Sequence, residues 1–115
     1  MAELKDRLRS DLTVSMRGRD ELRTATIRMV LTAVTNAEVA GAQAREISDD
    51  EVVGVLAKEA KKRRDAADAF RQGGRPDLAE REDAEAAVIA GYLPAPLTDD
   101  ELDALVDAAV AETGA

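Results

Sequence analysis

The sequence contains no cysteine, histidine or tryptophan, and its only aromatic residues are one tyrosine and one phenylalanine among 115 residues. Without cysteine, neither a disulfide framework nor a thiol nucleophile can form. Without histidine, the chain lacks the commonest general base and the commonest metal ligand. None of its serines has a visible base, and its glycines form neither a P-loop nor a dinucleotide-binding motif. We therefore expect no catalytic centre, no metal and no cofactor.

Long hydrophobic runs are also missing. No apolar stretch approaches the ~20 residues that a membrane-spanning helix needs. The N-terminal stretch MAELKDRLRSD is charged and has no apolar segment typical of a secretory signal. From these two absences we expect a soluble, cytoplasmic protein that does not contact a membrane.

The residues that are abundant favour helix. Alanine, glutamate, arginine and leucine dominate the chain, and no segment alternates as a strand would. Nearly half of the apolar residues are alanine, so the predicted core is thin and requires closely packed helices. The composition predicts an all-α protein, and the thin core makes a homo-oligomer plausible.

Apolar spacing and capping signals divide the chain into five helices. Ser48 with Glu51, and Thr98 with Glu101, have the spacing of a capping box. The predicted helices span 3–17, 20–40, 49–72, 76–92 and 98–113. We expect residues 1–96 to form an antiparallel bundle of about four helices. Residues 97–115, with the short fifth helix, would begin a second small domain.

Four charged residues fall on or beside apolar stripes of the predicted helices. Paired carboxylates one helical turn apart can bind a metal or act as acid and base, but such sites in helical bundles also use histidine, which this chain lacks. The interpretation that we prefer is a structural ion pair within the core. Its members would be Arg28, Arg63, Glu82 and Glu85.

A basic cluster begins at the stretch KEAKKRRDAADAF, residues 58–70. Residues 55–75 carry seven basic and three acidic groups, a net charge of +4, in a chain whose net charge is −8. The cluster is either a solvated helix face with acid–base pairs one turn apart, or a surface for an anionic partner. That partner could be nucleic acid or the acidic last third of the same chain. The residues that would contact phosphate are Lys58, Lys61, Lys62, Arg64, Arg71 and Arg75.

The order of several short motifs resembles the YqeY family over nearly the whole chain. These are the Arg28-Met29 pair, the K-x-x-K-x-R run from Lys58, the GGRPDL turn, the Glu82 and Glu85 pair, and YLP followed by LTDDEL. No single motif identifies the family, but the order and spacing of all of them do.

The resemblance implies a function as well as a fold. The family is similar to the helical tail domain of GatB, the B subunit of the tRNA-dependent amidotransferase, which touches tRNA while other parts of the complex perform the glutamine-dependent carbon–nitrogen ligase chemistry. A non-catalytic accessory module that binds tRNA or an amidotransferase is therefore the first hypothesis. The alternative is a protein-interaction module that uses an apolar face around YLPAPL and has no nucleic-acid contact. Relatives usually continue into a second helical domain, which we expect to be missing after Ala115.

Overall fold

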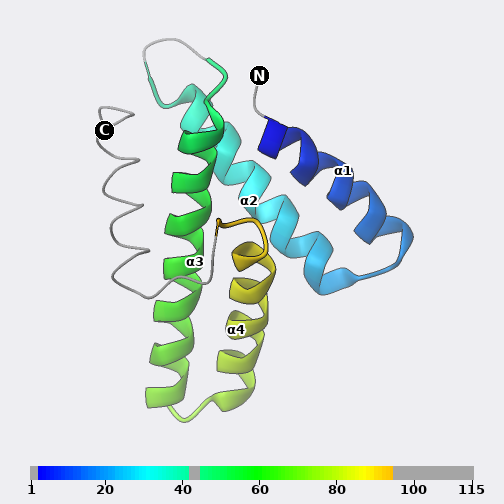
Figure 1. Cartoon of the computed structure of the whole chain (residues 1–115). Coiled ribbons are helices and arrows are strands. Elements are labelled where there is room, and N and C mark those ends of the chain that lie inside the picture. The colour runs from blue at the N-terminus through cyan, green and yellow to red at the C-terminus, as the bar shows by residue number, and fades with distance from the viewer. Residues whose placement is uncertain (1–2, 42–44, 95–115) are drawn as a thin grey trace.

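The computed structural model describes residues 3–41 and 45–94, which contain four α-helices and no strand (Figure 1). The helices are α1 (Glu3–Arg17), α2 (Glu21–Val39), α3 (Asp49–Gln72) and α4 (Pro76–Ala90). The all-α prediction is confirmed, and the first four predicted ranges agree with the helices within two residues at each end. The predicted fifth helix and second domain, residues 97–115, lie outside the described residues.

The helices form two antiparallel hairpins that pack on each other (Figure 1). One hairpin is α1 with α2 and the other is α3 with α4. The contact between α3 and α4 is the most extensive, and α2 packs against both of them. Consequently α2 is covered by neighbours along much of one side, while the exposed side chains of α3 include Lys58 and Lys62.

The core is small and consists of aliphatic side chains with one aromatic. Alanine fills much of the seam between α3 and α4, where Ala57, Ala60, Ala67 and Ala79 are buried. Such short side chains let two helices approach closely, as the composition predicted. The larger buried side chains are Leu8, Ile27, Val30, Val34, Ile47, Val52, Leu56, Ile89 and Tyr92.

The start of α3 carries the predicted capping box. The amide of Glu51 donates to Ser48 Oγ at 3.2 Å, and the amide of Ser48 donates to Glu51 Oε1 at 3.2 Å. Ile47 and Val52, on either side of the cap, are both buried in the core. Arg45 also donates to both carboxylate oxygens of Glu51, at 3.2 and 2.7 Å. This bidentate contact lowers the pKa of Glu51 below its ordinary value.

The end of α1 is closed by a residue other than glycine. The amide of Asp20 donates to the Ser15 carbonyl at 3.0 Å, and the amide of Arg19 donates to the Met16 carbonyl at 3.2 Å. This is the pair of bonds of a Schellman motif, and its left-handed position is occupied by Arg19 with φ 55°, not by Gly18. The helix ends where predicted, but a non-glycine residue adopts the strained conformation.

Met16 is not part of the buried face of α1, although its spacing from Leu8 and Leu12 suggested that it would be. It is 50% exposed, and Ser15 is buried in its place. The Ser15 hydroxyl lies 2.9 Å from the Thr24 hydroxyl and donates to the Leu12 carbonyl at 3.0 Å. A satisfied polar contact between α1 and α2 therefore replaces the apolar contact that the pattern predicted.

Candidate nucleic-acid interface

The solvent face of α3 presents two of the six predicted contact residues, Lys58 and Lys62. Both are exposed, and they follow each other by one helical turn. Lys58 has no ion pair within residues 3–41 and 45–94, whereas Lys62 Nζ lies 3.4 Å from Glu59 Oε2. Lys61 and Arg64 are half-buried on the same helix. By helical geometry, Lys58 and Lys62 lie on the side of α3 away from the buried alanines at its seam with α4.

The other two predicted contacts, Arg71 and Arg75, lie near the α3–α4 turn and are paired with carboxylates. Arg71 donates to Asp83 at 2.7 Å and to Asp68 at 3.0 Å. Arg75 donates to both oxygens of Asp77, at 3.3 and 3.2 Å. Each contact favours the charged forms, so Asp83 raises the pKa of Arg71 and Arg75 lowers the pKa of Asp77. An incoming phosphate would have to compete with these carboxylates.

The basic excess of α3 is balanced in space by α4. Residues 55–75 have a net charge of +4, but residues 76–90 carry five acidic groups and one basic group, a net charge of −4. The two charges cancel, so the segment 55–90 is neutral overall. The two helices pack along each other, which brings the opposite charges close together. The structure therefore separates the predicted cluster into an exposed lysine face, Lys58 and Lys62, and a compensated end, Arg71 and Arg75.

The seam between α3 and α4 contains three of the four residues predicted to form a structural ion pair. Arg63 Nη1 lies 3.6 Å from Glu82 Oε2 and 3.7 Å from Glu85 Oε2. Arg81 approaches Glu85 from the rim at 3.4 Å, and Glu59 is buried beside them. Arg63, Glu82 and Glu85 are mostly shielded from solvent, whereas Arg81 is exposed. The distances are those of ion pairs and not of short hydrogen bonds. The arrangement can hold the hairpin together through ion pairs between α3 and α4.

The fourth residue, Arg28, does not join this group. It is exposed on α2, and its guanidinium Nη2 lies 3.6 Å from Met16 Sδ on α1. The buried residues of α2 include Ile27, and the next position along a helix is rotated by about 100°. Arg28 therefore points away from the core and needs no buried partner.

Sequence reasoning missed a cluster formed by Arg7, Asp11 and Tyr92. The hydroxyl of Tyr92, just after α4, donates to Asp11 Oδ2 on α1, and the Arg7 guanidinium lies 4.8 Å above the tyrosine ring. Burial and then the Asp11 carboxylate raise the pKa of Tyr92 to about 12, because both disfavour the phenolate. The YLP motif was the available signal, but sequence cannot reveal a partner 81 residues away.

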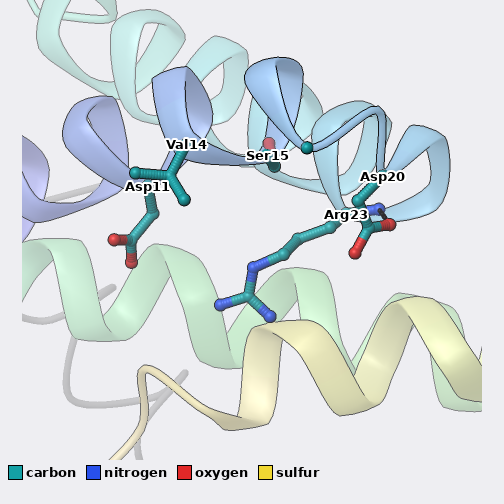
Figure 2. A pocket seen from close by; sticks show the side chains of 6 residues that line it. Asp11, Val14, Ser15, Asp20 and Arg23 are labelled. Atoms are coloured by element: carbon teal, nitrogen blue, oxygen red, sulfur yellow. Dashed lines mark hydrogen bonds between the residues drawn. The ribbon is translucent and has the colours of Figure 1, made fainter.

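An open cavity of about 340 Å³ lies between the end of α1 and the start of α2, near this cluster (Figure 2). Figure 2 shows the Arg23 guanidinium reaching into the space near Asp11, with Asp20 at the edge. The Asp20 carboxylate accepts from the Arg23 amide at 3.0 Å as the N-cap of α2. Within the described ranges, no group of three or more acidic side chains could hold a metal ion. In the same ranges, no helix is both long and apolar enough to cross a membrane.

Comparison with known proteins gives a consistent result. A family model described as Yqey-like protein matches residues 5–115. Altered inheritance of mitochondria protein 41, mitochondrial, of Lachancea thermotolerans is 34% identical over 86 residues, which are 75% of this chain and 46% of the relative. The protein of the same name from Clavispora lusitaniae is 36% identical over 95 residues, 82% of this chain and 54% of the relative. A Schizosaccharomyces pombe protein is 32% identical over 88 residues, 76% of this chain and 69% of the relative.

Two facts follow from these matches. The chain spans about half the length of the first two relatives. The names of those relatives also place them in mitochondria, so the prediction of a cytoplasmic location is wrong. The lack of a secretory signal argued only against secretion. It carries no information on whether a protein is located in mitochondria.

Proposed function

The chain belongs to the YqeY family, and on that premise we propose that it is a non-catalytic helical module that binds RNA through the lysine face of α3. The RNA class that the family resemblance suggests is tRNA, and the associated process is glutamine-dependent tRNA amidation, carried out by an amidotransferase partner. In this role the chain contributes binding and positioning, while the chemistry belongs to the partner.

One observation carries the proposal. Lys58 and Lys62 stand on the exposed side of α3, and Lys58 has no carboxylate within ion-pair distance in the described part of the chain. Lys58 can therefore bind a phosphate oxygen without first losing a partner from among the residues that the structure describes. Lys62 is held by Glu59, and half-exposed pairs of this kind contribute at most about 1 kcal/mol. A phosphate can replace such a pair.

The expected recognition is of the RNA backbone and its shape, not of base sequence. Lysine side chains act as point charges on phosphate, and such contacts carry no sequence information. Phe70 is half-buried and Tyr92 is buried, so neither aromatic ring forms a platform on which unpaired bases could stack. The module would bind structured RNA such as tRNA with modest affinity and strong salt dependence.

Fluorescence anisotropy of labelled tRNA, titrated with the chain at low salt, tests the proposal. We expect the variant Lys58→Gln with Lys62→Gln to weaken binding roughly tenfold, since two phosphate contacts of about 0.7 kcal/mol each are lost. The matched control, Arg71→Gln with Arg75→Gln, removes the same charge from side chains that are already paired, and should change affinity less than about twofold. Equal losses in both variants would indicate nonspecific attraction, and no binding by the folded wild-type chain would refute the proposal.

A further inference from the structure

Four arginines lie on α1, on α2 and in the turn that joins these helices, and one of them contacts Met16. Arg28 of α2 reaches Met16 Sδ at 3.6 Å, and Arg19 follows in the turn, where its amide donates to the Met16 carbonyl. Arg17 is the next residue, and Arg9 lies two turns earlier on the same side of α1. All four arginines are exposed. We name this set, Arg9, Met16, Arg17, Arg19 and Arg28, the arginine–methionine surface.

These arginines differ from those of the other hairpin in having no carboxylate partner. Within residues 3–41 and 45–94, none of the four lies within ion-pair distance of an acidic side chain, whereas Arg63, Arg71, Arg75 and Arg81 each do. The acidic residues near the turn are Asp20, which caps α2, and Glu21, which is exposed. The four guanidinium groups of this surface therefore form no ion pair with the described part of the chain.

The backbone at this surface is strained. Arg19 has φ 55°, a strained conformation for a non-glycine residue, and the position is one that glycine usually occupies. Gly18 immediately before it is not in a left-handed conformation, so the strain cannot be assigned to a shifted glycine. The Schellman bonds hold Arg19 in this conformation, and strained residues cluster at functional sites.

We propose that the arginine–methionine surface is a docking site for an acidic segment of a partner protein that carries an exposed apolar side chain. Carboxylates of the segment pair with the arginines, and the apolar side chain contacts Met16. Arginine and methionine are the residues enriched in protein interfaces, while lysine is depleted, and this surface contains no lysine. The absence of an aromatic ring among its residues favours protein over single-stranded nucleic acid. The site is separate from the lysine face of α3, so the chain can bind RNA and protein on different surfaces.

A titration of the isotope-labelled full chain, followed by NMR, tests the proposal. The probe is a synthetic amphipathic peptide of glutamate, aspartate and leucine. One control peptide has lysine in place of the acidic residues, and another has serine in place of leucine. We expect the acidic amphipathic peptide to shift the Met16 methyl signal and the amide signals of residues 16–19 and 28. The lysine peptide should shift none of these, and the serine peptide should leave the Met16 methyl unmoved.

Variants link the shifts to the named residues. Arg17→Gln with Arg28→Gln should weaken peptide binding roughly tenfold, as loss of two ion pairs predicts, whereas Arg71→Gln with Arg75→Gln should leave it unchanged. Arg19→Gly should weaken binding while stabilising the fold, an outcome that a structural role for this arginine cannot give. Millimolar peptide without a Met16 shift would overturn the proposal. Peptide-induced shifts confined to α3 would also overturn it. A third contradicting outcome is that tRNA displaces the peptide by binding at Met16.

Discussion

Arg63 of α3 lies between two carboxylates of α4, with its Nη1 atom 3.6 Å from Glu82 and 3.7 Å from Glu85. The guanidinium thus joins the two helices of the most extensive contact in the fold. Its Nε atom and Glu82 Oε2 are buried and have no hydrogen-bond partner in the described part of the protein. A seam of this kind contributes specificity of packing more than net stability.

Removal of Arg63 should therefore be costly because it leaves carboxylates uncompensated. We expect Arg63→Leu to lower the free energy of unfolding by about 3 kcal/mol, measured by urea denaturation. Addition of Glu82→Gln and Glu85→Gln to that variant should recover most of the loss, since the uncompensated charges are then gone. A cost below about 1 kcal/mol for Arg63→Leu would place the seam among ordinary surface pairs.

The contact between Arg45 and Glu51 predicts an acid-dependent stability. Because the pKa of Glu51 is lowered in the folded state, its stabilising effect is present above the ordinary value of 4.5 and is lost as pH falls below it. The wild-type unfolding free energy should decrease over this range more steeply than that of Arg45→Gln, which retains the Ser48 cap. Parallel pH profiles of the two proteins in thermal denaturation would contradict the assignment.

The Tyr92 contact predicts an alkaline dependence of the opposite sign. The pKa of Tyr92 is raised from 10.0 to about 12, so its contribution is present below pH 10 and is lost as pH rises from 10 towards 12. Since Tyr92 is the only tyrosine, tyrosinate absorbance reports on it directly. A folded-state midpoint near 10 would show that Tyr92 is neither buried nor in contact with Asp11. Tyr92→Phe should cost about 1 kcal/mol of stability.

The left-handed Arg19 predicts a stabilising substitution. Arg19→Gly should raise the unfolding free energy by about 1 kcal/mol, since glycine adopts this conformation without strain. Arg17→Gly is the matched control, because Arg17 is the last helical residue, where glycine should cost up to about 1 kcal/mol. Urea denaturation of the two variants distinguishes the effects. If both substitutions destabilise the protein, the turn does not have the described conformation.

Local signals predicted the helices of this fold well. The Ser48 and Glu51 box, Pro76 at the start of α4 and the paired glycines before it each act through neighbouring backbone, so their effect is readable from a few residues. The resemblance to the family, which rested on the order of such motifs, is also confirmed.

Properties that depend on the neighbouring helix could not be predicted in the same way. Arg28 and Met16 sit within apolar patterns, but alanine-rich helices have apolar residues on several faces, so spacing alone does not identify the buried one. The positive charge of α3 was counted along the sequence, while the acidic residues of α4 that balance it become neighbours only in the folded hairpin.

The salt dependence of tRNA binding tests the central proposal most directly. If Lys58, Lys62 and their half-buried neighbours Lys61 and Arg64 neutralise phosphates, the logarithm of the association constant should fall with the logarithm of salt concentration with a slope of roughly −3. The Lys58→Gln and Lys62→Gln variant should reduce that slope by roughly 2, because each substitution removes one phosphate contact. An unchanged slope in this variant would show that the lysine face of α3 does not contact the RNA.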